Sequence, residues 1–457
     1  MQTNFTPDQL RDPQLRESEQ ILRSCVHCGF CTATCPTYVL LGDELDSPRG
    51  RIYLMKDMLE AGRPATPDVV KHIDRCLSCL ACMTTCPSGV NYMHLVDHGR
   101  AYIEKTYRRP ASERLLRAAL ARVLPDRRLF RAALGLARLA SGLAPLLRFL
   151  PQGDRLAAML ALAPARLPQA AAPSVSRLPA GQARARVALL QGCAQSVLAP
   201  SINEAAARLL NRAGVEVVTA SEGCCGALVH HLGKEELARA QARQVIDAWI
   251  REIEAGGLDA IVITASGCGT TIKDYGFLFR TDAAYAEKAA RVSALAKDIT
   301  EFLAEIDLPP SAGEIGSLVV AYHSACSMQH GQKIVSLPSS LLARMGFSLR
   351  APAEGHLCCG SAGTYNMLQP ELACELGMRK AKHVDSTGAD IIAAGNLGCL
   401  VQIALYSSKP TVHTVELLDW ATGGPVPPAL SGLTLARFDA PEKSASPQAA
   451  TESNAIW

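Results

Sequence analysis

The sequence predicts an α plus α/β chain, with an all-α N-terminal domain, a basic helical linker and two repeated α/β half-domains. Two cysteine runs near the N-terminus are joined by a segment with helical periodicity. Beyond about residue 185, strand-like runs alternate with helical patterns, which is typical of layered α/β structure. That second region carries the same cysteine pattern twice, which indicates two homologous halves.

The composition indicates a globular chain with metal or redox chemistry. The 457 residues are 48% hydrophobic and 19% charged, and no stretch of about 18 uncharged apolar residues predicts a spanning helix. The first residues lack a basic start followed by an apolar core, so we expect a cytoplasmic chain, with peripheral contact at the cytoplasmic face of the inner membrane as an alternative. Cytosolic cysteines stay reduced, so the 17 present favour metal or redox chemistry over disulfides.

The N-terminal cysteines form two runs with one spacing, Cys-x2-Cys-x2-Cys-x3-Cys-Pro. This spacing is typical of ferredoxins with two [4Fe–4S] clusters, in which the fourth cysteine of each run reaches the other cluster. A pair of zinc sites is disfavoured, because zinc takes four ligands and has no use for a third evenly spaced cysteine. We therefore assign the first cluster to Cys25, Cys28, Cys31 and Cys86, and the second to Cys76, Cys79, Cys82 and Cys35.

Periodicity and breaker residues divide the chain into five parts. Ile52, Met55, Met58 and Leu59 recur at helical spacing, which predicts a helix between the runs and hence the helical variety of two-cluster domain. A Pro/Ala-rich stretch marks a boundary near residue 180, and a Pro/Ser/Ala-rich tail is expected to be disordered. The predicted parts are a helical ferredoxin-like domain (1–105), a basic helical segment and linker (106–185), two Cys-Cys-Gly half-domains (186–312 and 313–428) and the tail (429–457).

Each half-domain carries a single cysteine, then a Cys-Cys-Gly triplet, then another cysteine, and the two sets are offset by 133, 134 and 131 residues. The glycine permits the backbone kink that adjacent cysteines need to point the same way. Four soft ligands at strand ends favour a third iron–sulfur cluster or a zinc ion, and buried apolar thiols are the plainer alternative. The eight cysteines are Cys193, Cys224, Cys225, Cys268, Cys326, Cys358, Cys359 and Cys399.

Several motifs resemble those of one known family. CVHCGFCTATCPTY, LLGDELDSPRGRIYLMKDMLE, RCLSCLACMTTCPSGV, CCGSAGTYN and AAGNLGC are similar to the iron–sulfur subunits of glycolate oxidase (glycolate dehydrogenase). The wider superfamily includes subunits of heterodisulfide reductase, lactate-utilisation systems and anaerobic glycerol-3-phosphate dehydrogenase. The resemblance implies an electron-transfer subunit that takes electrons from separate flavin-binding subunits, where glycolate is oxidised to glyoxylate, and passes them to a quinone-type acceptor.

The chain departs from the superfamily pattern at one point. The fullest Cys-Cys-Gly motif ends in Cys-x2-Cys, but Thr271 and Gln402 stand at the last position here. The half-domains can therefore hold a third cluster or a zinc ion, or one half can be empty. His323, three residues before Cys326, could supply a missing ligand, although a histidine in the core is the commoner case. A heterodisulfide reductase-like protein, or a lactate or glycerol-3-phosphate dehydrogenase subunit, is the alternative function.

No catalytic residue is assigned, because the sequence shows no flavin or nicotinamide fingerprint and no nucleophile pair. We therefore do not expect the chain alone to oxidise glycolate. Between residues 100 and 186 there are 17 basic and four acidic side chains. We rank three interpretations of this stretch. Docking on a partner subunit comes first, a solvated helical face second, and contact with anionic lipid third. Nucleic acid is not expected as a partner, because the arginines alternate with leucine and alanine instead of stacking aromatics.

Overall fold

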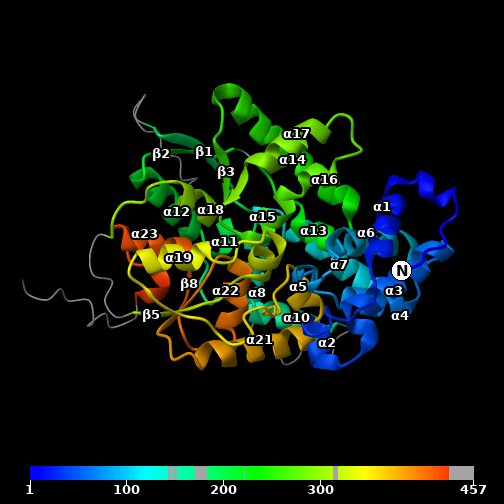
Figure 1. The fold of residues 1–457 in the computed structure, drawn as a ribbon. Coiled ribbons are helices and arrows are strands. Elements are labelled where there is room, and N and C mark those ends of the chain that lie inside the picture. The colour runs from blue at the N-terminus through cyan, green and yellow to red at the C-terminus, as the bar shows by residue number, and fades with distance from the viewer. Residues whose placement is uncertain are drawn as a thin grey trace, which may run out of the picture.

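The computed structural model describes residues 1–140, 142, 147, 152–169, 183–220, 222–311 and 318–431, and it confirms the predicted α plus α/β class. In Figure 1 the helical N-terminal part, in blue, lies beside the two α/β halves, which run from green to red. The tail predicted to be disordered lies outside the described residues from position 432 onward, as does the Pro/Ala-rich stretch 170–182.

The N-terminal part consists of short helices that begin where the sequence provides a cap and a proline. The side chains of Asp12, Ser47 and Thr66 each accept a hydrogen bond from the first turn of a helix whose first residue is proline. The helix predicted between the cysteine runs is present as α3. The helices are α1 (Pro13–Ser24), α2 (Pro36–Leu41), α3 (Pro48–Ala61), α4 (Pro67–Asp74), α5 (Ala81–Thr85) and α6 (Tyr92–Thr106), with 3-10 turns at Gln9–Arg11 and Glu44–Asp46.

Helices α1, α3, α4 and α6 enclose one apolar core. Met55 and Leu59, on the apolar stripe of α3, are at most 1% exposed. Cys25, Cys76 and Cys82 belong to the same buried cluster. The cysteine loops are thus held by packed helices.

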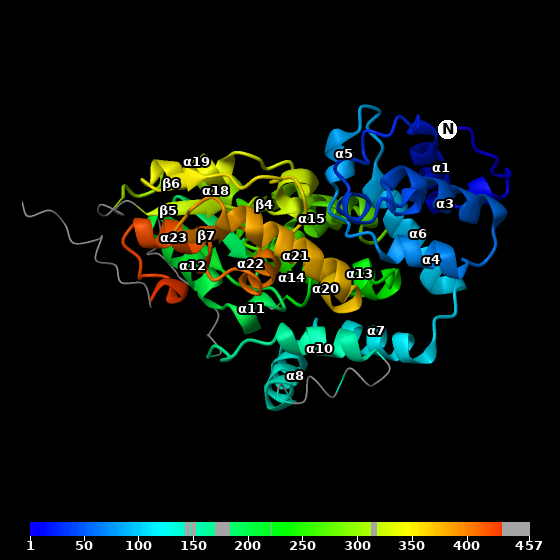
Figure 2. The same cartoon turned by 90° about the horizontal axis from the view of Figure 1, so that it is seen from below.

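The basic segment folds into helices α7 (Ala111–Val123), α8 (Arg127–Ala140) and α10 (Gly153–Ala161). Figure 2 shows these three helices together along one side of the molecule. Arg109 is buried and its Nη1 donates to Asp74 Oδ2 at 2.5 Å and to Glu113 Oε1 at 2.8 Å. Arg117 is also buried and donates to the carbonyl oxygen of Leu232 at 3.2 Å. These two arginines bind the segment to the rest of the chain. The segment is therefore not solvated on all sides.

Each α/β half is built on a four-stranded, all-parallel sheet. The strand order is β2-β1-β3-β4 in the first half and β6-β5-β7-β8 in the second, which is the same order counted from the start of each half. The repeat seen in the cysteines is therefore a repeat of the fold. The strands are β1 (Ala185–Leu189), β2 (Val215–Val218), β3 (Ala260–Ile263), β4 (Ala296–Asp298), β5 (Val319–Tyr322), β6 (Ser348–Arg350), β7 (Ile391–Ala394) and β8 (Thr411–His413).

The helices cover both faces of each sheet. In the first half they are α11 (Gln195–Leu198), α12 (Ser201–Arg212), α13 (Ala227–His231), α14 (Glu235–Gly256), α15 (Ser266–Lys273), α16 (Tyr275–Leu278), α17 (Ala286–Leu295) and α18 (Ile299–Glu305). In the second half they are a π-helical turn (Ser327–Gly331), α19 (Leu337–Arg344), α20 (Tyr365–Leu368), α21 (Pro370–Asp385), α22 (Leu397–Ala404) and α23 (Thr414–Ala421), followed by a 3-10 turn (Pro428–Leu430).

The two halves share one hydrophobic core. Alternate strand residues face opposite sides, so that Val187 and Leu189 of β1 point into the shared core while Ala188 points into a core of the first half alone. Helix α12 packs on α23, and the matching pair α18 and α19 packs in the same way. This symmetric packing fixes one half against the other, with the carboxyl ends of the strands of both halves near each other.

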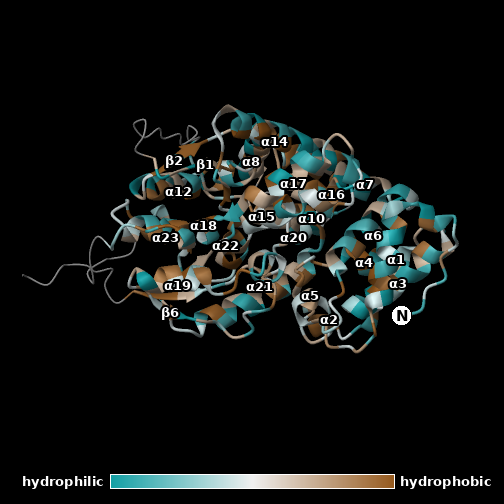
Figure 3. Cartoon of the chain, turned by 45° about the horizontal axis from the view of Figure 1, so that its top comes forward, coloured by the Kyte–Doolittle hydropathy of each residue, from teal (hydrophilic) through white to brown (hydrophobic). Residues whose placement is uncertain are grey.

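The hydropathy colouring in Figure 3 agrees with this burial, because the helices carry both teal and brown residues. In the part of the chain that the structure describes, we find no helix with the length and apolar character needed to cross a membrane.

A buried histidine joins the halves. His413 is 0% exposed, its Nε2 donates to the carbonyl oxygen of Thr264 at 2.8 Å, and its Nδ1 accepts from the backbone N–H of Val415 at 3.2 Å. The second contact requires a neutral imidazole, because a protonated Nδ1 cannot accept a hydrogen bond. Burial lowers the pKa of His413 to about 4.

We predict that this histidine makes the stability of the chain depend on pH. Its pKa is lower in the folded than in the unfolded state, so its contribution is complete above about pH 6.5 and is lost as the pH falls toward 4. A shift of this size corresponds to about 3 kcal/mol. Anaerobic denaturant unfolding at several pH values is expected to show a shallower loss of stability in His413→Asn than in the unchanged chain. The control, His356→Asn at an exposed histidine, should keep the original slope, and equal slopes in all three proteins would contradict the prediction.

Candidate metal centres

The structure gathers the N-terminal cysteines into two adjacent groups. Cys25, Cys28, Cys31 and Cys86 line one cavity, and Cys76, Cys79, Cys82 and Cys35 line a second. Each group thus takes three cysteines from one run and the last cysteine from the other. The side chains of Pro48, Cys82 and Tyr92 border both cavities, so the two sites are neighbours.

Matched backbone turns shape the two loops. His27 and Gly29 in the first run, and Ser78 and Leu80 in the second, all have positive φ values, at two and four residues after the first cysteine. Such turns point successive N–H groups inward and create a concavity for an anion, which is a known feature of iron–sulfur sites. The N–H of Ser78 points to Cys76 Sγ at 3.4 Å. The backbone therefore suits a negatively charged cluster in each loop.

Crowding of the thiols also favours a cation among them. Burial, together with the nearness of Cys25, raises the pKa of Cys31 to about 11. Burial raises the pKa of Cys82 as well. Thiolates become stable in such places when a metal ion supplies positive charge, so the donor set fits iron and sulfide better than free thiols.

A buried arginine lines the second cavity, and the sequence analysis assigned it no role. Arg51 is 1% exposed, and its guanidinium donates to the carbonyl oxygen of His72 at 2.6 Å, to Thr37 at 3.0 Å and to Asp46 at 3.1 Å. Its Nη1 also lies 3.7 Å from Cys35 Sγ. Its position on the apolar stripe of α3, four residues before Met55, is the signal that could have revealed a buried cation.

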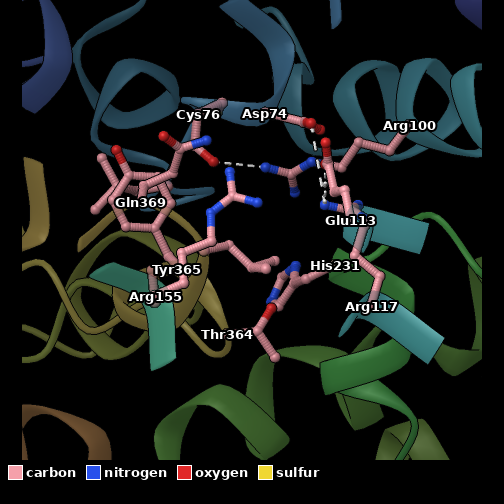
Figure 4. A pocket seen from close by; sticks show the side chains of 13 residues that line it. Asp74, Cys76, Arg100, Glu113, Arg117, Arg155, His231, Thr364, Tyr365 and Gln369 are labelled. Atoms are coloured by element: carbon pink, nitrogen blue, oxygen red, sulfur yellow. Dashed lines mark hydrogen bonds and ion pairs between the residues drawn. The ribbon is translucent and has the colours of Figure 1, made fainter. Parts of the chain in front are cut away.

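A second arginine holds the second cysteine loop (residues 76–86) in place. Arg100 on α6 donates to the carbonyl oxygen of Cys76 and to Ser78 Oγ, both at 2.6 Å. Figure 4 shows Arg100 beside Arg117 and Arg155 of the basic segment, in a pocket that Tyr365 of the second half also lines. The second cysteine loop therefore lies where the N-terminal part, the basic helices and the second half meet.

The cysteines of the α/β halves lie at the carboxyl ends of the strands. Cys193 follows β1 and Cys268 follows β3, and in the second half Cys326 follows β5 and Cys399 follows β7. Each pair flanks the point where the strand order reverses. In open α/β sheets, ligands bind at this topological switch point.

The glycine of each triplet is required by its backbone. Gly226 and Gly360 have φ values of +86° and +91°, which side chains disfavour. A Cβ atom would lie 2.9 Å from the carbonyl oxygen of Ala238 in the first half and 2.7 Å from that of Ala373 in the second. Glycine lets the turn lie against α14 in the first half and against α21 in the second.

The sulfur atoms of each half come together. Cys193 Sγ lies 3.4 Å from Cys224 Sγ, and Cys326 Sγ lies 3.7 Å from Cys358 Sγ. In the second half, a ring nitrogen of His323 and the sulfur atoms of Cys359 and Cys399 all lie within 4.8 Å of one another.

Two residues stand where the fullest motif has a fifth cysteine, and both have structural contacts. Thr271 Oγ1 donates to the carbonyl oxygen of Gly267 at 3.3 Å, inside its own helix. Gln402 Nε2 donates to the carbonyl oxygen of Ala373 at 2.9 Å. Neither residue takes the place of a ligand.

A buried lysine also belongs to the second site, although the sequence reasoning did not select it. Lys380 on α21 is 2% exposed and donates to the carbonyl oxygen of Glu354 at 2.7 Å. Burial lowers the pKa of Lys380, and the nearby thiols of Cys359 and Cys358 oppose that shift. An ammonium beside these sulfurs adds positive charge to the site.

One cavity of about 620 Å³ connects all eight of these cysteines. Apolar residues of α7, α8 and α10, among them Leu120, Phe130 and Met159, line its other side. Leu136 of α8 lines the cavity and is 68% exposed, so the cavity reaches the surface there. The basic segment thus covers the space in front of the strand ends.

The second N-terminal loop touches the second half directly. Leu77 and Cys79 share a buried apolar cluster with Cys358 and Tyr365, and Cys326 packs against it. Burial, followed by the nearness of Cys326, raises the pKa of Cys79. The N-terminal sites and the sites of the second half are therefore in contact through neighbouring cysteines.

Comparisons with known proteins agree with this arrangement. Residues 21–90 match the 4Fe-4S dicluster domain family, and residues 187–273 and 320–404 each match the cysteine-rich domain family. The chain is 44% identical to the glycolate oxidase iron-sulfur subunit of Escherichia coli K12, over 92% of this chain and 99% of that one. This chain belongs to the family of glycolate oxidase iron–sulfur subunits. As a member of that family it is an electron-transfer subunit of an oxidoreductase and carries iron–sulfur clusters.

More distant relatives agree with this membership. The probable glycolate oxidase iron-sulfur subunit of Bacillus subtilis 168 is 33% identical over 89% of this chain and 96% of that one. The Lactate utilization protein A of Shouchella clausii is 25% identical over 48% of this chain and 89% of that one. The glycolate oxidase subunits therefore match almost the whole chain, whereas the lactate-utilisation relative matches about half.

We predict that the last cysteine of each run serves the cluster of the other run. Cys35→Ser should change the low-temperature EPR spectrum of the reduced chain as Cys79→Ser does, because both cysteines line the second cavity. Cys86→Ser should resemble Cys28→Ser, because both line the first. Iron analysis of each variant provides the control for cluster loss. If the spectrum of Cys35→Ser matched that of Cys28→Ser, each run would hold its own cluster and the assignment would be wrong.

Proposed function

We propose that the chain relays electrons from a flavin-binding partner, which oxidises glycolate to glyoxylate, to a quinone-type acceptor. The observation that carries the proposal is the contact of the second N-terminal loop with the second α/β half, through Cys79 and Cys358. This contact links the N-terminal sites to the cysteine-lined cavity in one continuous series. The subunit names of the relatives support a complex with other glycolate oxidase subunits.

The proposed ligands follow the groups of cysteines. One [4Fe–4S] cluster would be held by Cys25, Cys28, Cys31 and Cys86, and the other by Cys76, Cys79, Cys82 and Cys35. When bound, such clusters accept and release single electrons. The chain's own part is to hold these sites close together, to bury them, and to place Arg51 and Arg100 beside the second one.

We place the acceptor in the cavity between the halves. Its apolar wall of leucine, alanine and methionine suits an isoprenoid quinone better than a charged acceptor. The cavity opens beside α8, on which Leu136, Leu139 and Arg128 are exposed. Exposed leucines beside arginines suit the surface of an anionic membrane, so this side is proposed as the peripheral contact with the cytoplasmic face of the inner membrane.

The complete complex tests the proposal in two steps. Glycolate added anaerobically is expected to reduce the N-terminal clusters, as seen by EPR, and a soluble quinone is expected to oxidise them again. Clusters that stay oxidised while the flavin is reduced would contradict the relay itself.

A substitution in the cavity tests the acceptor site separately. Ala133 on α8 lines the cavity, so Ala133→Trp should fill part of it and slow quinone-dependent glycolate oxidation about tenfold, with cluster reduction by glycolate unchanged. The control is Ala240→Trp at an exposed position of α14 that does not line the cavity, which should keep the normal rate. Equal rates in the two variants would exclude the cavity as the acceptor site.

A further inference from the structure

We propose that His323 is a nitrogen ligand of a metal centre in the second α/β half, where it binds together with Cys359 and Cys399. The metal is of the class that takes mixed imidazole and thiolate ligands, namely iron of an iron–sulfur centre or zinc. The proposal does not depend on the electron donor or acceptor, because all of its residues belong to this chain.

The ligand atoms are close enough to surround a single metal atom. The His323 nitrogen and the two sulfur atoms lie within 4.8 Å of one another. Metal–nitrogen and metal–sulfur bonds of about 2.0 and 2.3 Å place the ligands of one tetrahedral metal roughly 3.5 Å apart, so only small side-chain adjustments are needed. Cys326 and Cys358, whose sulfurs are 3.7 Å apart, already have such a spacing.

The histidine has no other evident task. It is 1% exposed, its ring nitrogens have no hydrogen bond of good geometry among the residues that the structure describes, and the polar group nearest to it is the thiol of Cys359. A buried imidazole without a partner is costly to the fold, whereas a metal bond to one nitrogen would satisfy it. Its position is also fixed, because its backbone N–H donates to the carbonyl oxygen of Ala393 at 2.8 Å.

The repeat supplies an internal comparison. The residue at the same place in the first half is Leu190, which directly follows β1 and whose N–H donates to the carbonyl oxygen of Val262 in the adjacent strand at 3.0 Å. Leucine cannot bind a metal. The two halves share a backbone and four cysteines each, but only the second has an imidazole at this position.

The number of ligands favours a multinuclear centre. With His323, the second half brings five donors to one place, the others being Cys326, Cys358, Cys359 and Cys399. A structural zinc ion takes four ligands and would leave one donor unused. An iron–sulfur centre has several metal atoms and can use all five, with the imidazole on one iron.

The test compares the unchanged chain with His323→Leu and His323→Cys, purified anaerobically. We expect the unchanged chain to hold metal beyond the irons of the two N-terminal clusters, and X-ray absorption to show a nitrogen ligand on that metal. His323→Leu, which copies the first half, should lose this metal. His323→Cys should keep it without the nitrogen signal, and, for an iron centre, with a lower reduction potential, since a thiolate adds negative charge. Metal analysis shows whether iron or zinc is present.

Two further measurements keep the result interpretable. The EPR signals of the N-terminal clusters report whether each variant is folded. His330→Gln is the matched control, because His330 lies in the same half but already bonds to Thr84 and to the carbonyl oxygen of His356. Unchanged metal and nitrogen signals in His323→Leu, or no additional metal in the unchanged chain, would overturn the proposal. Loss of the N-terminal clusters in both His323 variants would also overturn it, since that result means a packing role.

Discussion

The contact between the second N-terminal cysteine loop and the Cys-Cys-Gly turn of the second half organises this molecule. Leu77, Cys79 and Cys358 share one buried apolar cluster, so neither surface can move without exposing apolar side chains to water. Arg100 also holds the loop, because it donates a hydrogen bond to the carbonyl oxygen of Cys76. Electron transfer needs redox sites at short and constant separation, and this packing provides a rigid base for it.

The same contact makes the two halves different, although they arise from one repeated unit. Both halves place their cysteines at a switch point between parallel strands, and both require glycine in the turn. The second half packs its own cysteines against the second N-terminal loop, and it is also the half that buries His323 and Lys380 near its cysteines. A repeat normally supplies two equivalent sites. In the function that we propose, the second half belongs to the electron path, and the first half provides the opposite wall of the cavity.

Much of the fold could be predicted from the sequence because its signals are local. Three such signals depend on residues that are near neighbours in the chain. They are the regular spacing of the cysteine runs, the apolar stripe that contains Met55 and Leu59, and the repeated Cys-Cys-Gly triplets. These features led to the α plus α/β class that the structure confirms. The grouping of Cys35 with Cys76 was also an expectation from spacing, and it remains a prediction as far as cluster ligation is concerned.

The rest could not be predicted because it depends on tertiary packing. Nothing in the spacing of Cys326 or Cys193 indicates which half lies against the N-terminal loop. The basic segment was expected to dock on a partner, but Arg109 and Arg117 are buried within the chain and the helices around them cover the cavity. Arg51 lies inside a recognised motif, yet its contact with Cys35 joins α3 to the residue that precedes α2.

The central claim is that electrons leave the N-terminal clusters through the second half. The most direct measurement is the rate at which quinone oxidises the glycolate-reduced clusters in the complete complex, compared between Cys358→Ala and Cys224→Ala. These substitutions remove the same thiol from the same turn of the two halves, so each serves as the control for the other. We expect Cys358→Ala to slow this step about tenfold more than Cys224→Ala does. Equal rates, or the larger effect in Cys224→Ala, would contradict it.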